Sequence, residues 1–165
     1  IEASKQFHII SKSVYEAEKV GERPVFTQRK MPNALAILAL HQFSKLEKFN
    51  KHRKKIAHLY RHELQGRVEM TRIVPETENI YLRFTIFTQN RDAIIKQAKK
   101  REIYLGDWYT TSIAPQGVDY ACLKYDKKLC PKAEKRAGES LNLPTQIQIS
   151  EQEAKKIIKV IKQYL

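Results

Sequence analysis

The fold is decided by the stretch from Cys130 to Glu153, which is CPKAEKRAGESLNLPTQIQISEQE. Pro131 suits the first turn of a helix, because the N–H that proline lacks has no helical acceptor there. Ser150 and Glu153 form the capping-box pattern that begins a second helix. Two strand-like segments lie between these helices, Leu141–Leu143 and Gln146–Ile149. The stretch therefore predicts helices and short strands in close succession.

A long helix is predicted upstream, beginning at Pro32 and ending before Gly66. Its apolar residues recur every three to four positions, which is the helical period. About thirty residues at 1.5 Å each give a rod of roughly 45 Å. Residues Ala34–Leu40 are apolar nearly all round, which predicts burial on more than one side, part of it against polypeptide outside this sequence. We expect such a rod to connect two masses or to lie across a subunit boundary.

The remaining elements predict an α+β fold. Arg67–Val74 and Ile80–Thr88 are rich in β-branched and aromatic residues and flank a turn-like segment, which predicts an antiparallel pair of strands. Further predicted elements are a helix over residues 5–19, a helix from Arg91 to about Arg101 capped by Asn90, and a short strand at Glu102–Leu105.

The bulk composition restricts the class of protein. A chain of 165 residues forms one domain, with or without an attached arm. Its longest apolar run, Ala34–Leu40, is far shorter than the roughly 18 residues of a membrane span. Cys122 and Cys130 do not make a secreted disulfide framework, and no signal peptide is evident. We expect a soluble, cytoplasmic protein. Because no Met stands at the start, we expect the chain to be cut from a longer one.

The formal net charge of +13 favours an anionic partner. The densest basic run lies on the predicted long helix and comprises Lys45, Lys48, Lys51, Arg53, Lys54 and Lys55. One interpretation is a solvated helix surface. Another is a non-enzymatic module that binds nucleic acid, although no zinc finger, RNP-type motif or helix-turn-helix is evident.

Few residues suggest chemistry. His58 and His62 lie four positions apart, but no third metal ligand is evident, so we expect no metal site. For Cys122 and Cys130 a structural role is favoured over a nucleophilic one. Trp108 and Tyr109 lie in an irregular segment, residues 106–129. Their flat faces suit stacking on a sugar or a base, while the alternative is that Trp108 fills the core beside the sheet.

Several segments together resemble the DegT/DnrJ/StrS-type sugar aminotransferases, which depend on pyridoxal phosphate (PLP). They occur in the family's order and comprise Met31–Lys48, Asn50–Ala57, Asn90–Asp92, Ile103–Gly106, Cys130–Glu134, Leu141–Pro144 and the closing capped helix. The resemblance covers roughly residues 20–165. It implies a type I fold aminotransferase divided into residues 1–30 from the large cofactor domain, a bridging helix over 31–65, and a small C-terminal α+β domain over 66–165.

The resemblance also implies a function. The full-length protein would move an amino group from an amino-acid donor to a keto sugar nucleotide, as a homodimer. The Schiff-base lysine lies upstream of the matched region, so the fragment alone is expected to be inactive. The apolar half of the long helix is compatible with a dimerisation face.

The resemblance further suggests four site residues. Gln28 and Lys30 stand where the family has an Asn and an Arg that reach across the dimer toward the partner's cofactor phosphate and substrate. Lys30 keeps the cation but lacks the two-pronged contact of arginine. Gly106–Tyr109 stands where the family has a His-Tyr-Pro segment, which makes Trp108 and Tyr109 the candidates for substrate binding.

Overall fold

The computed structural model of the protein describes residues 14–24 and 30–165. Its helices are α2 (Glu16–Lys19), α3 (Asn33–Phe43), α4 (Leu46–Leu64), α5 (Arg91–Lys99), the 3₁₀ turn η1 (Lys127–Leu129), α6 (Pro131–Glu139) and α7 (Glu151–Lys162). Its strands are β1 (Glu69–Met70), β2 (Phe84–Phe87) and β3 (Ser140–Leu143). Most of the helix predicted over residues 5–19 lies outside the described residues, and so does Gln28.

The strands form one antiparallel sheet in the order β1-β2-β3. The predicted antiparallel pair and the strand at Leu141–Leu143 are therefore confirmed, although the first two strands are shorter than expected. The other strand-like segment, Gln146–Ile149, is not a strand. Ile149 donates its backbone N–H to the Gln146 carbonyl at 2.9 Å, because the chain must turn after Pro144 to reach the first residues of α7.

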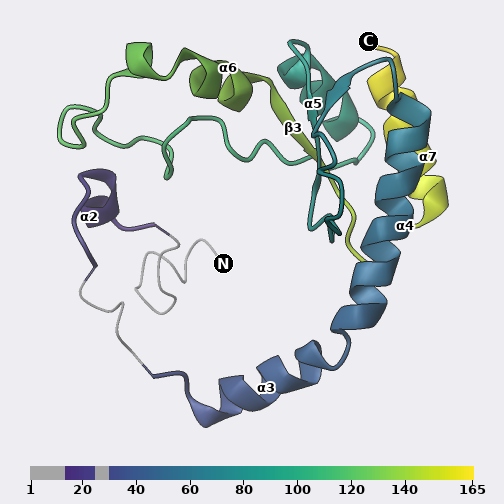
Figure 1. Ribbon diagram of the computed structural model, residues 1–165, viewed down its shortest axis with the longest axis horizontal. Coiled ribbons are helices and arrows are strands. Elements are labelled where there is room, and N and C mark those ends of the chain that lie inside the picture. Colours follow the sequence, from purple (N-terminus) through teal and green to yellow (C-terminus); the bar gives the residue numbers. More distant parts are fainter. Residues whose placement is uncertain (1–13, 25–29) are drawn as a thin grey trace.

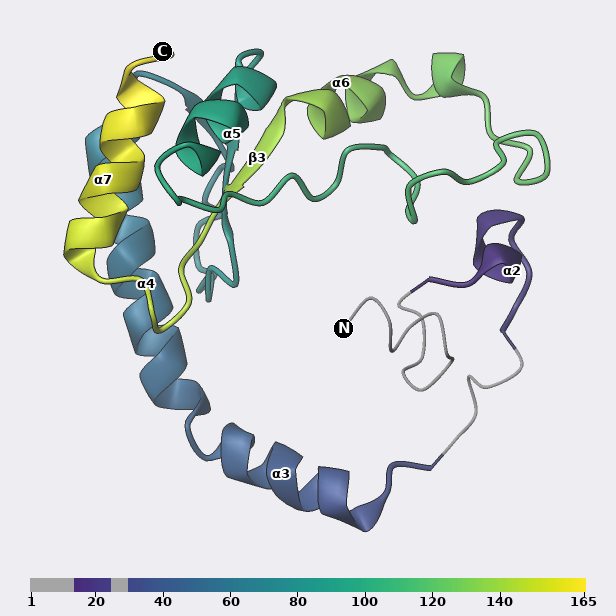
Figure 2. The ribbon, with the colours of Figure 1, turned by 180° about the vertical axis from the view of Figure 1, so that it is seen from behind.

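One face of the sheet carries the core. Side chains alternate between the two faces of a strand, so Phe84, Ile86, Leu141 and Leu143 all point the same way and are buried. Helices α4 and α7 lie side by side over them in Figures 1 and 2, with α5 against α7. The helices contribute Ile56, Ala57, Tyr60, Leu64, Ile94, Ala154, Ile157, Ile158 and Ile161 to the same cluster. The sequence patterns of α6 and of α7 with its Ser150–Glu153 capping box are confirmed.

The single long helix was a wrong prediction, because the chain bends at Ser44 and Lys45 between α3 and α4. The Ser44 hydroxyl donates to the His41 carbonyl at 2.8 Å, a local bond that competes with the helical pattern. All of α3 is exposed, and both views show it extending away from the rest of the fold. The burial expected for Ala34–Leu40 is therefore not supplied by the described residues. No helix among them is both long and apolar enough to cross a bilayer.

Two smaller predictions also need correction. Asn90 precedes α5, but its side chain makes no cap and donates instead to the Tyr164 carbonyl at 2.7 Å. The strand predicted at Glu102–Leu105 is reduced to one antiparallel bridge between Gly106 and Asn142. Glu102 has a φ of 59°, which breaks the extended conformation at the first residue of that segment.

A buried threonine fixes the chain after β3. Thr145 is fully buried, and its hydroxyl lies 2.7 Å from the Tyr81 carbonyl and 3.1 Å from the Leu82 carbonyl. A buried acceptor that loses its donor retains the cost of desolvation. The hydroxyl therefore ties the segment before β2 to the segment after β3.

We predict that Thr145→Val lowers the free energy of unfolding by about 1–3 kcal/mol, because valine keeps the shape and removes the donor. Urea unfolding followed by circular dichroism measures the change. Thr71→Val is the matched control, because the Thr71 hydroxyl is exposed and lies 3.5 Å from its acceptor, the Thr85 carbonyl. Equal losses in the two variants would contradict the assignment.

Candidate functional site

A groove of about 790 Å³ lies on the face of the sheet that faces away from the core. Its floor is made by the outward residues of β2 and β3, namely Thr85, Phe87, Ser140 and Asn142. Helix α6 forms one wall through Ala133, Arg136 and Ala137, and residues 108–114 form the other. The groove thus combines an apolar surface with polar groups from the strands, as ligand sites commonly do.

Hydrogen bonds from β3 fix the start of the loop over residues 106–129. The backbone groups of Gly106 and Asn142 exchange two bonds, at 2.8 and 2.9 Å. The Trp108 carbonyl accepts from the Asn142 amide and, at 3.2 Å, from the Ser140 hydroxyl. The side-chain oxygen of Asn142, Oδ1, in turn accepts from the Thr85 hydroxyl at 2.7 Å. These bonds position Trp108 at the mouth of the groove.

The two predicted substrate-loop residues are both at the surface. The exposed fraction is 58% for Trp108 and 63% for Tyr109, and both line the groove. The alternative that Trp108 fills the core is therefore wrong. The Arg83 guanidinium lies 4.3 Å from the centroid of the Trp108 ring, a stacking contact between a cation and an aromatic face. The site role of these two aromatic residues stays a prediction.

The far end of the loop is attached to α6 by three side chains. The Ser112 hydroxyl donates to Glu134 and lies 2.8 Å from the Tyr125 hydroxyl, which donates to the same carboxylate oxygen at 2.9 Å. The bond from Ser112, followed by that from Tyr125, lowers the pKa of Glu134. The carboxylate therefore stays charged at neutral pH and holds the loop against the helix.

The other predicted residues lie elsewhere. Lys30 is exposed just before α3 and does not line the groove. His58 and His62 are exposed on α4, and no cluster of three His, Cys, Asp or Glu side chains is found within residues 14–24 and 30–165. Cys122 and Cys130 are exposed free thiols.

The basic run on α4 is partly compensated by acidic neighbours. Lys54 pairs with Glu78, and Lys55 pairs with Glu151 at 2.6 Å. The Arg53 guanidinium donates to the Asn50 side chain at 2.7 Å. These contacts break the run into separate charges, which favours the interpretation as a solvated helix surface.

Sequence reasoning missed Arg83, Arg136, Asn142 and Glu134 as residues that build the groove. The alternation of Arg83, Thr85 and Phe87 with buried Phe84 and Ile86 was the available signal, because period-two patterning separates the faces of a strand. The side-chain hydrogen bonds of Asn142 and Glu134 join residues that are not neighbours in the sequence, so no local pattern could predict them.

A model of the DegT/DnrJ/EryC1/StrS aminotransferase family matches residues 2–162. The chain belongs to this family. The predicted resemblance is thereby confirmed, and aminotransferases of this family depend on PLP. No curated protein gives a significant match to the chain.

Solved structures of aminotransferases share the fold. A DegT DnrJ EryC1 StrS aminotransferase from Brucella abortus is 23% identical, with a TM-score of 0.70 over 87% of this chain and 40% of its own. DesV from S. venezuelae is 20% identical, with a TM-score of 0.72 over 88% of this chain and 41% of its own. Spr1654 from Streptococcus pneumoniae, described as a putative sugar aminotransferase, is 24% identical, with a TM-score of 0.72 over 81% of this chain and 35% of its own. Other structures of Spr1654 are of its PLP and PMP forms.

The chain thus spans about 40% of the length of the first two of these solved structures. What it contributes is an α+β fold with an open groove, a loop clamped to the sheet, and an exposed apolar helix.

We predict that the attachment of the loop to α6 depends on pH. Because the folded pKa of Glu134 is lowered from its usual 4.5, the stabilisation is complete above about that pH and is lost as the pH falls through the folded value. Trp108 is the single tryptophan, so its fluorescence anisotropy reports loop mobility. The anisotropy should be constant from pH 8 to 5 and fall at lower pH.

Glu134→Gln, which carries no titrating carboxyl, should remove that acid transition. Tyr125→Phe should keep it, because Ser112 still donates to the carboxylate. An unchanged acid transition in Glu134→Gln would show that another group controls the loop.

Proposed function

We propose that this chain forms the small domain and bridging helices of an aminotransferase that transfers an amino group from an amino acid to a keto sugar nucleotide. The observation that carries the proposal is the family match over residues 2–162. The same proposal divides the chain into residues 1–30 from the large cofactor domain, a bridging segment over 31–65, and the small domain over 66–165.

The chemistry of the groove supports a sugar nucleotide as the substrate. Trp108 and Tyr109 present flat apolar faces at its mouth, which suit the face of a sugar ring or a base. Thr85 and Ser140 place hydroxyl oxygens on the floor, which can accept from ligand hydroxyl groups because their own protons are donated to Asn142 and to the Trp108 carbonyl. The residues of this chain would orient the substrate, while PLP supplies the electron sink when it is bound.

The groove alone does not fit PLP. Covalent attachment of this cofactor needs a lysine amine, and none of the described residues that line the groove is a lysine. By the family resemblance, we propose that the Schiff-base lysine lies in polypeptide upstream of this chain. The 165-residue chain alone is expected to be inactive.

Gln28 and Lys30 are proposed to act across a homodimer. Lys30 is exposed and lies three residues before the first residue of α3, whose side chains are all exposed. A lysine ammonium binds phosphate as a point charge, without the two-pronged geometry of arginine. Both residues are proposed to approach the partner's cofactor phosphate.

Transamination assays test the proposed function. The product of the complete gene and the 165-residue chain are each incubated with PLP, L-glutamate and a panel of keto sugar nucleotides. We expect 2-oxoglutarate and an amino sugar nucleotide only from the complete product. Turnover by the chain alone, or no sugar transamination by the complete product, would contradict the proposal.

We predict that Trp108→Ala in the complete enzyme raises KM for the sugar nucleotide about tenfold and changes kcat less than threefold. The loss removes stacking on the substrate, which is of the order of 1 kcal/mol or more. Leu129→Ala is the control, because Leu129 is 78% exposed and does not line the groove. A fall in kcat with unchanged KM would contradict a binding role.

A further inference from the structure

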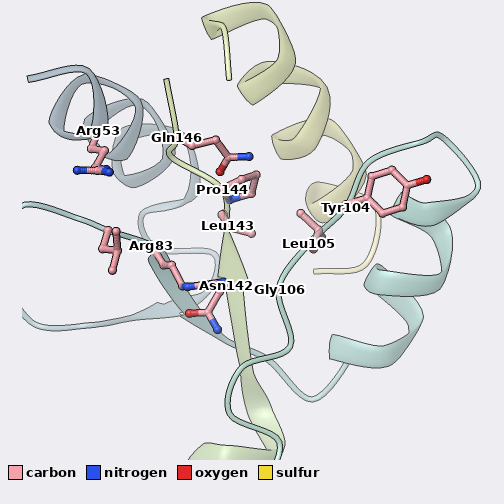
Figure 3. A pocket seen from close by; sticks show the side chains of 10 residues that line it. Arg53, Arg83, Tyr104, Leu105, Gly106, Asn142, Leu143, Pro144 and Gln146 are labelled. Atoms are coloured by element: carbon pink, nitrogen blue, oxygen red, sulfur yellow. The ribbon is translucent and has the colours of Figure 1, made fainter. Parts of the chain in front are cut away.

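A second cavity of about 380 Å³ adjoins the groove where β3 runs into Pro144 (Figure 3). It shares Leu82, Arg83 and Asn142 with the groove, so Arg83 stands between the two spaces. Figure 3 shows Arg53 on α4 and Arg83 before β2 on the same side of β3, with Arg83 pointing toward Asn142. Tyr104, on the other side, points away. Two guanidinium groups therefore line a space large enough for a small polar group.

The charge of this cavity is uncompensated. Among the described residues, those that line it include two arginines and no carboxylate. No ion pair found among residues 14–24 and 30–165 includes Arg53 or Arg83. Arg136 and Arg91 differ, since they pair with Glu69 and Asp92. Guanidinium groups without acidic partners attract an oxyanion from solution.

Both guanidinium groups are also held in place. The Asn50 side chain accepts from Arg53 at 2.7 Å, and the central carbon of the Arg83 guanidinium lies over the Trp108 ring, 4.3 Å from its centroid. A stacked guanidinium keeps its N–H groups directed outward in the plane of the fork, where they can bind two oxygens. Because these side chains are already ordered, the binding of an anion costs less conformational entropy.

Gly106 makes the position of Arg83 possible. A Cβ atom at Gly106 would lie 3.1 Å from Arg83 Nη1 and 3.2 Å from the Asn142 Cβ. Both contacts are tighter than side chains normally accept, so the bare backbone lets Arg83 approach β3 closely. Gly106 of the loop, Asn142 of β3 and the Arg83 side chain are thus packed closely together.

We propose that Arg53 and Arg83 bind the diphosphate of a nucleotide-linked ligand, with the attached sugar or base lying against Trp108 and Tyr109 in the adjoining groove. The identity of the ligand as a sugar nucleotide rests on the proposed function. The oxyanion pocket itself does not, because it follows from the two arginines and their surroundings.

Titration of the 165-residue chain with inorganic pyrophosphate at constant ionic strength tests the pocket. Calorimetry gives the affinity, and the fluorescence of Trp108 reports on the ring against which Arg83 stacks. We expect saturable binding at a single site, tighter for pyrophosphate than for inorganic phosphate. Arg53→Ala and Arg83→Ala should each weaken it about tenfold or more, the size expected for a lost charge-assisted hydrogen bond.

Two further variants control for charge. Arg83→Lys keeps the charge but loses the stacked fork, and should weaken binding about fivefold. Arg72→Ala removes one positive charge from an exposed residue outside the cavity and should change the affinity less than twofold. An equal loss in Arg72→Ala and Arg83→Ala would show attraction by the net charge of +13 and overturn the pocket. Absence of saturable binding would overturn it as well.

Titration with UDP and a UDP-sugar separates this inference from the proposed function. Binding of pyrophosphate and UDP that depends on Arg53 and Arg83 supports the pocket whether or not the complete gene product transaminates sugars. A pyrophosphate site that excludes both UDP and the UDP-sugar would overturn the diphosphate assignment, while the transamination result would be unaffected.

Discussion

The arrangement of the candidate site depends on the side chain and backbone of Asn142. This residue is 6% exposed, and its backbone pairs with Gly106 while its amide binds Thr85 and the Trp108 carbonyl. A buried amide is stabilising only when its donors and acceptors are satisfied, so these partners restrict one another. Asn142 thereby converts an irregular loop into a fixed wall. The position of Trp108, and through it that of Arg83, follows from this constraint.

The core provides the rigid support for that constraint. Helices α4 and α7 cover one face of the sheet with fully or nearly fully buried side chains such as Ile56, Tyr60 and Ile161, which leaves the opposite face of β2 and β3 free to carry polar residues. The two faces differ because successive side chains of a strand point to opposite faces of the sheet. Helix α3 takes no part in this core, and its apolar residues are exposed in the part of the chain that the structure describes.

The sequence predicted best what local rules control. Pro131 at the start of α6 lacks a backbone N–H that would have no helical acceptor, and the Ser150–Glu153 box before α7 satisfies nearby backbone groups; both predictions were correct. Errors arose where a distant or competing partner decided the outcome. Asn90 binds Tyr164 rather than its own helix, and Ser44 interrupts a helix whose apolar pattern is continuous. The stacking of Arg83 on Trp108 and the bond from Tyr125 to Glu134 join separate elements, which periodicity cannot reveal.

Hydrogen–deuterium exchange of Asn142→Ala tests the central claim most directly. We predict that the Gly106 amide, which donates to the backbone carbonyl of residue 142 at 2.9 Å, exchanges at least tenfold faster than in the wild-type chain, because the side-chain bond that holds the neighbouring Trp108 carbonyl is lost. Peptides from α4 and α7 should keep their protection, since the core lies on the other face of the sheet. Unchanged exchange at the Gly106 amide, with the core still protected, would contradict the claim that Asn142 holds the loop in place.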